Sequence, residues 1–493
     1  MVCDFFYPSA GGVENHVHQL AQCLLRLGHK VIVITHRYGQ RTGVRWLAGG
    51  LKVYHVPFSA VYDGSLLPTA MLLLPLLRDI LVRENITTVH AHAVCTMSLE
   101  AVVLAALMGY RVVYTEHSNF GTSGVIDASL NRLSQAALSH ADALISVSRT
   151  CQANMALRCK LPSDKIAIIP NAVDASHFKP DSSYVPPAGR VVVIVLTRLV
   201  WRKGVQLLAD LLPEACARHP DVDFVIGGDG PKRGLLEATI ERHGLDARVE
   251  MLGHVAHRDV PAVLTRGRLF LHTSLTEAFC IAILEAVCCG LTVVSTNVGG
   301  VPELLPAHMV EAGAMVLADP TCPALLAALD AAMPTVRARD DTARIARSAP
   351  GRSHRAGQSE RSPRPGRADT RINSPADFHS EVASLYSWMQ VARRTARLYD
   401  ALEERPRPAL RQRLGRLLSS GLGPLSATLA LLVVLAQALL LGWLRLWRPA
   451  EGIERAPDLP ADAWARTKRG EYESLPVRGD YLRSLTESRT FVR

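Results

Sequence analysis

Two successive series of short apolar runs, rich in Val and Ile and separated by helical patterns, constrain the fold of this chain most strongly. The first series ends near residue 169. A stretch rich in Pro, Ser and Gly, residues 180–190, then separates it from the second series. Alternation of strands and helices is typical of an open parallel sheet with helices on both faces. The 493 residues are enough for two or three domains with separate cores.

The first series predicts a strand that ends near Tyr7, followed by further strands and helices. The later strands are predicted at residues 30–35, 88–90, 111–115, 143–147 and 167–169, with helices at 13–27 and 97–108. The second series predicts strands at 191–196 and 222–227, helices at 206–218 and 234–243, and further elements at 249–252, 269–272, 282–289 and 292–296. We therefore predict an α/β protein of two doubly wound Rossmann-like domains, residues 1–180 and 181–333. Their strands are expected to end at a shared cleft, where ligands bind in such folds.

Regular patterning stops after Met333. Residues 334–376 are dominated by Arg, Pro, Ser and Gly, and this composition predicts a disordered insertion or an artefact of the gene model. Helical periodicity returns in residues 377–404, which we predict to form a closing helix. The Arg-rich run also supplies much of the net charge of +10, but it contains no aromatic side chain to stack on bases. We therefore expect no nucleic-acid partner.

Residues 422–444 are almost wholly apolar and uncharged, and their number matches the thickness of a bilayer core. The sequence predicts a single transmembrane helix here, followed by a tail at residues 449–493. Arginines are dense in residues 393–416, which favours a cytosolic location for the large N-terminal part. Met1 is followed directly by Val2, Cys3 and Asp4, a pattern unlike that of a signal peptide.

Several loops carry residues suited to binding a phosphorylated ligand. Gly11 and Gly12 lie between the first predicted strand and the first helix, where a backbone turn can approach a ligand closely. Gly228 and Gly300 lie in similar turns after predicted strands of the second domain. His117 follows a strand of the first domain and is expected to contact a sugar or its leaving group, although a lone His is more often structural.

Charged residues of the second domain complete the candidate site. Arg198 and Lys203 follow its first strand, and two cations at that position suit a diphosphate. Glu277 and Glu285 lie eight residues apart around an apolar helix start. A carboxylate in such surroundings is costly to bury unless it accepts hydrogen bonds, for example from ribose hydroxyls. The alternative interpretation is that all four are ordinary surface residues without a role in ligand binding.

These motifs occur in an order that resembles the retaining glycosyltransferases of the GT-B fold. The motifs are GGVE, EHS, PNAVD, RLVxRKG, GGDGP, EAFCxAxxE and GGVPE. With DFFYPxxGGVE, SLTEAFC and the late apolar helix, the chain resembles more closely the family of phosphatidylinositol N-acetylglucosaminyltransferase catalytic subunits. The resemblance covers nearly the whole chain.

The resemblance implies that the chain transfers N-acetylglucosamine from UDP-N-acetylglucosamine to phosphatidylinositol, as the first step of glycosylphosphatidylinositol anchor biosynthesis. It further implies partner subunits, a location in the endoplasmic reticulum membrane with the catalytic part cytosolic, and neither a cofactor nor a metal ion. By the same resemblance, Arg198 and Lys203 bind the diphosphate, Glu285 holds the ribose, and Glu277 and His117 contact the sugar. Gly11 and Gly12 allow the acceptor or a phosphate to approach.

The chain departs from the family pattern in two places. It begins almost inside the first predicted strand, and residues 335–373 have no recognisable counterpart. The alternative within the same class is a retaining transferase with a different lipid or sugar acceptor. An inactive scaffold protein is the alternative from another class, and the presence of Arg198, Lys203 and Glu285 argues against it.

Overall fold

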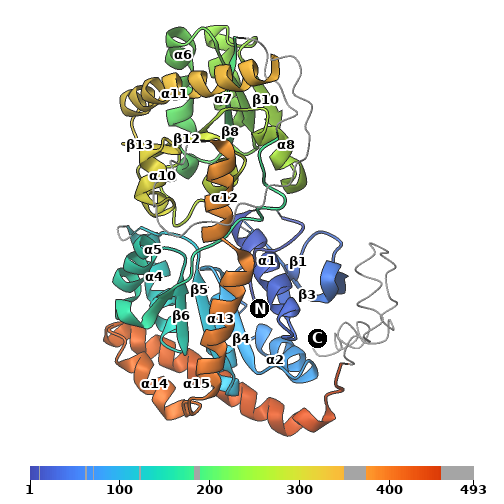
Figure 1. The fold of residues 1–493 in the computed structure, drawn as a ribbon. Helices are drawn as coiled ribbons and strands as arrows, with labels where there is room; N and C mark the ends of the chain where they lie inside the picture. The colour runs from blue at the N-terminus through green and yellow to red at the C-terminus, as the bar shows by residue number, and fades with distance from the viewer. Residues whose placement is uncertain are drawn as a thin grey trace, which may run out of the picture. The chain divides into compact units, whose positions relative to one another are not determined.

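The computed structural model describes residues 1–9, 11–61, 64–69, 71–121, 124–181, 189–348 and 374–456. The chain divides into two compact units (Figure 1). Unit 1 comprises Met1–Asn171 together with Trp388–Arg493, and unit 2 comprises Ala172–Ser387. The division therefore falls after Asn171 rather than at the predicted residue 180, and the chain returns to unit 1 after residue 387.

Unit 1 contains two groups of strands joined by Val2. The first group has the order β1-β3-β2, and the second has the order β4-β5-β6-β7. Val2 forms parallel bridges to Ile34 of β1 and to Ala91 of β4. The strands are β1 (Ile32–Arg37), β2 (Gly43–Leu47), β3 (Leu51–Ser59), β4 (Thr88–His92), β5 (Arg111–Glu116), β6 (Ala143–Ser146) and β7 (Ile166–Ile168). The predicted strand ending near Tyr7 is thus reduced to the single bridging residue Val2, and this part of the prediction was wrong.

The helices of unit 1 come from both of its chain segments. They are α1 (Gly12–Arg26), α2 (Leu73–Arg83), α3 (Thr96–Met108), α4 (Val125–Leu138), α5 (Arg149–Cys159), α13 (Trp388–Glu403), α14 (Leu410–Leu418) and α15 (Pro424–Trp447). Arg413 of α14 is 1% exposed, and it donates hydrogen bonds to the His140 carbonyl at 2.6 Å and to Asp142 Oδ2 at 3.1 Å. These contacts fix α14 on the domain formed by the first 171 residues.

Unit 2 contains one parallel sheet with the strand order β10-β9-β8-β11-β12-β13. Its strands are β8 (Val191–Leu196), β9 (Val222–Gly227), β10 (Val249–Gly253), β11 (Leu269–His272), β12 (Thr292–Thr296) and β13 (Met315–Ala318). The first strand is central, and the chain adds strands first on one side of it and then on the other. This is the doubly wound arrangement that the sequence predicted.

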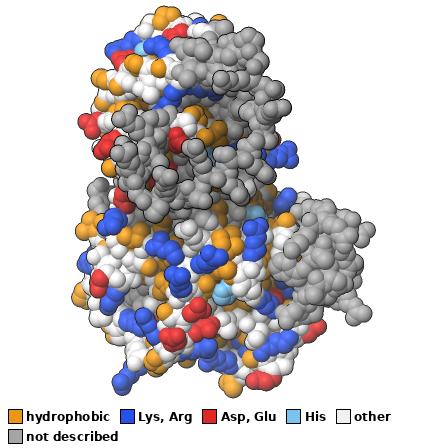
Figure 2. Space-filling view, in the orientation of Figure 1, with side chains coloured by type: hydrophobic (Ala, Val, Ile, Leu, Met, Phe, Trp, Pro, Cys, Tyr) orange, Lys and Arg blue, Asp and Glu red, His pale blue; other side chains and the backbone are white. Residues whose placement is uncertain are grey.

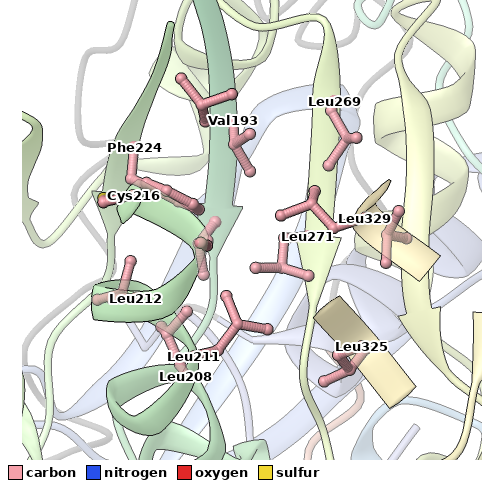
Figure 3. Close-up of a cluster of buried hydrophobic side chains, with 14 of the residues drawn as sticks. Val193, Leu208, Leu211, Leu212, Cys216, Phe224, Leu269, Leu271, Leu325 and Leu329 are labelled. Carbon is pink, nitrogen blue, oxygen red and sulfur yellow. The ribbon is translucent and has the colours of Figure 1, made fainter. Parts of the chain in front are cut away.

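Helices cover both faces of the sheet of unit 2, and each face has its own apolar core. The helices are α6 (Val205–Arg218), α7 (Arg233–His243), α8 (Val260–Leu264), α9 (Ile281–Cys288), α10 (Ala307–Glu311), α11 (Cys322–Ser348) and α12 (Pro375–Leu385). On one face, Leu208 of α6 and Leu329 of α11 pack near Val193 of β8 (Figure 3). On the other face, Ile283 of α9 and Phe378 of α12 pack with Phe270 of β11.

Two predictions for the region after Met333 need correction. The helix α11 continues to Ser348, so residues 334–348 are helical and not disordered; residues 349–373 lie outside the described residues. The apolar face of α11 extends to Val336, and Arg337 forms a bidentate ion pair with Asp221 at 2.8 and 2.9 Å. The predicted closing helix at 377–404 is two helices, α12 and α13, which belong to different units.

Within the described part of the chain, α15 is the one helix long and apolar enough to cross a membrane. Its mean hydropathy is 2.3, and 22% of its most apolar stretch is buried. Leu441 and Leu444 contribute to the core of unit 1, whereas Leu439, Trp443 and Leu446 are exposed. This helix corresponds to the predicted apolar segment at residues 422–444, and it is consistent with a single transmembrane helix.

Candidate active site

The candidate site of unit 2 lies at the carboxyl ends of its parallel strands. The strand order places a topological switch point between β8 and β11, because the chain leaves these two neighbours in opposite directions. Ligands of open α/β sheets bind at such a point. Lys203 ends a short 3₁₀ helix after β8, and Glu277 follows β11. Two of the predicted residues therefore flank the switch point.

Lys203 and Glu277 form an ion pair, with 2.5 Å between Nζ and Oε1. Glu277 is 9% exposed. Burial alone would raise the pKa of Glu277, but the charges of Lys203 and His272 outweigh it and hold the pKa well below its usual range. Glu277 is therefore ionised at neutral pH, and its carboxylate accepts hydrogen bonds.

His272, at the end of β11, is a second cation beside Glu277. Its Nε2 lies 3.2 Å from Glu277 Oε1, and its Nδ1 lies 2.9 Å from Ser295 Oγ. The Ser295 hydroxyl donates its hydrogen to the Thr296 carbonyl, so its oxygen accepts from His272. Burial would lower the pKa of His272, but Cys280 and Glu277 raise it to about 9. Both ring nitrogens are therefore protonated donors at neutral pH.

A glycine loop after β9 lies against the chain around Arg198. The φ angle of Gly228 is +142°, and a Cβ atom on this residue would lie 1.7 Å from the Thr197 carbonyl oxygen. The amide of Leu199 donates to the Asp229 carbonyl at 2.8 Å, which joins the two loops. Arg198 is exposed, and its side chain makes no hydrogen bond or ion pair within the described residues. The close approach of the two loops requires glycine at position 228. The exposed guanidinium of Arg198 is available to bind an anion.

Gly300 and Glu285 lie on two further segments of the same unit. The amide of Gly300 donates to the Glu277 carbonyl at 2.9 Å, so the Gly299–Gly300 turn lies beside Glu277. Glu285, in α9, is 8% exposed, and its Oε1 lies 3.2 Å from Nε2 of His257. This hydrogen bond raises the pKa of His257. Glu285 is thus held by His257 and does not belong to the Lys203–Glu277 cluster.

In unit 1, the half-buried His117 lies beside two buried histidines, His16 and His92. Its Nε2 lies 3.3 Å from Nδ1 of His92, and its ring centroid lies 4.5 Å from that of His16. The Nδ1 of His16 lies 2.7 Å from Asn171 Oδ1. Burial lowers the pKa of His117 and His92 well below the usual value and that of His16 to about 4. These rings are therefore neutral and act as hydrogen-bonding groups rather than as cations.

Gly11 and Gly12 lie at the start of α1, as predicted. Gly11 is the N-cap, and a Cβ atom on it would lie 2.4 Å from Oε2 of Glu14. Gly11 has no side chain to cap this helix end, and the amide of Asn15 donates to the Gly11 carbonyl at 3.0 Å. A Cβ atom on Gly12 would meet open space among the described residues. The glycine turn therefore lies beside the carboxylate of Glu14 at the start of α1.

Similarity to known proteins identifies the family to which this chain belongs. The family model described as PIGA (GPI anchor biosynthesis) matches residues 36–124, and that of glycosyl transferases group 1 matches residues 180–333. A relative from Arabidopsis thaliana, named as a subunit of phosphatidylinositol N-acetylglucosaminyltransferase, is 44% identical over 93% of this chain and 94% of its own length. The human protein of the same name is 39% identical, over 95% of this chain and 90% of its own length.

The chain belongs to the PIGA family of phosphatidylinositol N-acetylglucosaminyltransferase subunits. It is a glycosyltransferase of GPI-anchor biosynthesis. Among solved structures, a sucrose-phosphate synthase from Thermosynechococcus elongatus is similar, with a TM-score of 0.59 and 19% identity over 80% of this chain and 94% of that one. This likeness confirms the GT-B fold.

The described residues of this PIGA-family chain include two groups of three side chains spaced closely enough to hold a metal ion. They are His16 with His92 and His117, and His272 with Glu277 and Cys280. In the second group, His272 already contacts Glu277 and Ser295 through its two ring nitrogens. In the first group, two of the rings already contact each other and one contacts Asn171. The expectation of a metal-independent glycosyltransferase stays a prediction.

Sequence reasoning missed His272, His16 and His92. His117 was singled out because it follows a predicted strand, and His272 ends a predicted strand in the same way. The same rule would therefore have identified His272. The contacts of His16 join residues 155 positions apart in the chain, so no local pattern indicates them.

The charge of His272 predicts a pH-dependent stability. Because its pKa is raised from 6.5 to about 9 on folding, the folded chain holds the extra proton more tightly. The resulting stabilisation is fully present below pH 6.5 and is lost as pH rises through about 9. We expect the thermal midpoint of the purified chain to fall across this range more steeply than that of His272→Asn. Parallel midpoint curves for the two proteins would contradict a charged His272.

Proposed function

We propose that the chain transfers N-acetylglucosamine from UDP-N-acetylglucosamine to phosphatidylinositol. The bond between the anomeric carbon of the sugar and the diphosphate breaks, and a bond to an inositol hydroxyl oxygen forms with the same anomeric configuration. The hydroxyl proton is released, and UDP leaves. This proposal rests on similarity to relatives that are named as phosphatidylinositol N-acetylglucosaminyltransferase subunits. The similarity extends over at least 90% of both chains.

The donor is proposed to bind to unit 2. Arg198 and Lys203 bind the diphosphate, and their charge stabilises the negative charge that develops on departing UDP. The exposed guanidinium of Arg198 and the position of Lys203 after β8 support these roles. Glu285 is proposed to accept hydrogen bonds from the ribose, while Gly228 and Gly300 allow close approach of the backbone.

Further roles are proposed for residues of each unit. Glu277 is proposed to accept hydrogen bonds from sugar hydroxyls, a role supported by its ionised state between Lys203 and His272. His117, a neutral imidazole, is proposed to hydrogen-bond the sugar. Gly11 and Gly12 are proposed to allow the acceptor to approach the start of α1. The reaction is proposed to need no metal ion or cofactor.

The chain is proposed to act at the endoplasmic reticulum membrane, with α15 as a single transmembrane helix and the part of the chain before α15 in the cytosol. The length and hydropathy of α15 support a membrane location. Because the relatives are named as subunits, we also propose that the chain functions with partner subunits. A lipid acceptor requires such a location, since phosphatidylinositol resides in the membrane.

The proposal is tested by supplying labelled UDP-N-acetylglucosamine and phosphatidylinositol to membranes that contain the chain and its partner subunits. We expect labelled N-acetylglucosaminyl-phosphatidylinositol from the wild type and about tenfold less from Glu285→Ala, since the ribose contact is lost. Glu241→Ala, which removes an exposed carboxylate of α7, serves as the matched control and should leave the yield unchanged.

The identity of the acceptor is tested by replacing phosphatidylinositol with phosphatidylserine or with a polyprenyl phosphate. Label that appears in one of these lipids and not in phosphatidylinositol would establish a retaining transferase with another acceptor. Absence of any labelled lipid in the presence of the partner subunits would refute the proposed reaction.

A further inference from the structure

A cavity of about 400 Å³ opens in unit 1 beside the edge strand β2. Its lining includes Tyr7, Gln40, Arg41, Arg45, Trp46 and His55. Cavities of this size are typical of small-molecule sites. None of the residues discussed as the donor site belongs to it, so the cavity needs an explanation of its own.

One end of the cavity lies where the topology of unit 1 favours ligand binding, while Arg45 and Trp46 lie on β2 opposite the amino half of β3. β1 and β3 are parallel, with Thr35 opposite His55, and the turn from Tyr38 to Arg41 follows the carboxyl end of β1. Ligands of parallel sheets bind at this end of the strands. Tyr7 belongs to the segment that leads from the bridging residue Val2 into the glycine turn at Gly11. The segment that contributes Tyr7 to the cavity therefore continues along the chain into the glycine turn that is proposed to admit the acceptor.

The charged groups of the cavity are two arginines. Arg41 and Arg45 are exposed, and within the described residues neither side chain makes a hydrogen bond or an ion pair. None of the described lining residues is acidic. Planar guanidinium groups without a partner are well suited to a phosphate, which they bind through two parallel hydrogen bonds.

The remaining lining groups suit a ring that carries hydroxyls. The Nδ1 of His55 lies 3.1 Å from the His36 carbonyl, so it donates there and leaves Nε2 as an acceptor. Burial, together with Arg41 and Arg45, lowers the pKa of His55 and keeps the ring neutral. The side-chain amide of Gln40 both donates and accepts, and the faces of Tyr7 and Trp46 provide apolar surface.

We propose that this cavity binds the phosphoinositol head group of the acceptor lipid, with Arg41 and Arg45 at the phosphodiester and Gln40 and His55 at ring hydroxyls. The assignment rests on the proposed function, which supplies a phosphorylated polyol as the acceptor. The diphosphate of the donor is the other source of phosphate, and it is proposed to bind to Arg198 and Lys203 of unit 2.

Head-group binding is measured by calorimetric titration of the full-length chain in detergent with glycerophosphoinositol, the soluble head group. We expect Arg41→Gln/Arg45→Gln to weaken binding by about tenfold or more, because two charged hydrogen-bond donors are lost. Arg26→Gln, which removes an exposed arginine at the end of α1, should bind like the wild type. UDP should bind equally to all three proteins.

Other results of this titration would overturn the assignment. Unchanged affinity of the double variant for glycerophosphoinositol, or no binding to the wild type, would refute the head-group site. If inorganic phosphate or UDP competed with glycerophosphoinositol at the same concentrations, the cavity would be a general anion-binding site. Figure 2 shows acidic and basic side chains interspersed on the visible coloured surface, but the chain has a net charge of +10, so the phosphate and UDP controls are needed to exclude general attraction of anions.

The same preparations separate this assignment from the proposed reaction. Binding of glycerophosphoinositol that depends on the two arginines, without transfer of label to phosphatidylinositol, would support the cavity and count against the proposed reaction. Transfer by the double variant with an unchanged KM for phosphatidylinositol would refute the cavity while supporting the reaction. We expect a raised KM for phosphatidylinositol and an unchanged KM for UDP-N-acetylglucosamine.

Discussion

Replacing Lys203 by alanine is expected to lower the rate of sugar transfer by about 100- to 1,000-fold, the usual cost of losing one group that stabilises a developing negative charge. Lys203 follows β8 at the switch point, and its Nζ lies 2.5 Å from Glu277 Oε1. The ammonium group is thus held in place before the donor binds. The measurement is kcat for labelled transfer at saturating donor and acceptor.

The loss of Lys203 has a second consequence at Glu277. The lysine is one of the two cations that hold the pKa of Glu277 low, so Lys203→Ala leaves this buried carboxylate beside His272 alone. Lys203→Arg keeps the charge and should retain more activity than Lys203→Ala. Glu277→Gln keeps the shape and should also lose activity, because an amide oxygen accepts hydrogen bonds from sugar hydroxyls more weakly.

A structural role for the ion pair makes a different prediction. If Lys203 only neutralises Glu277, the double variant Lys203→Ala/Glu277→Gln should recover the activity lost in Lys203→Ala, since no buried charge is left unpaired. We expect no recovery, because the diphosphate still lacks its cation. Arg242→Ala, which removes an exposed charge at the end of α7, is the matched control and should leave kcat unchanged.

Most strands of unit 2 were predictable because they are short apolar runs, although β13 was not predicted. Val191–Leu196 became β8 with the predicted bounds, and Phe224 and Phe270 lie in its neighbours. Burial of both faces removes polar side chains from a strand, so the run is visible in the sequence. The antiparallel strand β2 lies at a sheet edge and keeps Arg45 exposed, so its sequence carried no such signal.

The length of α11 illustrates how tertiary contacts override composition. Residues after Met333 are rich in Arg and resemble a disordered segment, yet Val336 is buried and Arg337 pairs with Asp221 of the loop before β9. Arg339 donates to Thr292 Oγ1 at 3.1 Å. Partners more than 40 positions away in the chain give these arginines defined positions, and composition alone does not reveal them.

The candidate site was predictable in its residues but not in its pairing. Lys203 was singled out from its place after a strand, where parallel sheets gather functional groups, and Glu277 from its place at the start of an apolar helix. Their direct contact depends on the adjacency of β8 and β11, which the strand order decides. The charge on His272 depends on the contacts of its ring with Glu277 and Cys280, so it required the structure.

Replacing Arg158 by methionine is expected to lower the free energy of unfolding by about 3–5 kcal/mol, because it leaves a buried carboxylate without its partner. Arg158 of α5 donates from Nη2 to Glu116 Oε2 at 2.7 Å, and both side chains are fully buried. Glu116 Oε1 accepts from the amide of His117 at 3.0 Å, so the pair also fixes the start of the loop that carries this candidate site residue.

The double variant Glu116→Gln/Arg158→Met tests the origin of this loss. It removes both charges, and we expect it to be less destabilised than Arg158→Met, since a buried amide is easier to accommodate than an unpaired carboxylate. Thermal or denaturant unfolding of the full-length chain in detergent provides the measurement. Equal losses of unfolding free energy in the single and double variants would show that the effect comes from lost packing of the Arg158 side chain.

The pH dependence of Arg158→Met gives a further criterion. Burial raises the pKa of Glu116, and Arg158 counteracts this in the wild type. Without Arg158 the pKa rises further, so the folded variant takes up a proton that the unfolded chain releases. Because that proton stabilises the folded state, the loss relative to the wild type should be smaller near about pH 5 than near about pH 8. A loss that is the same at both pH values would exclude an unpaired Glu116 as its cause.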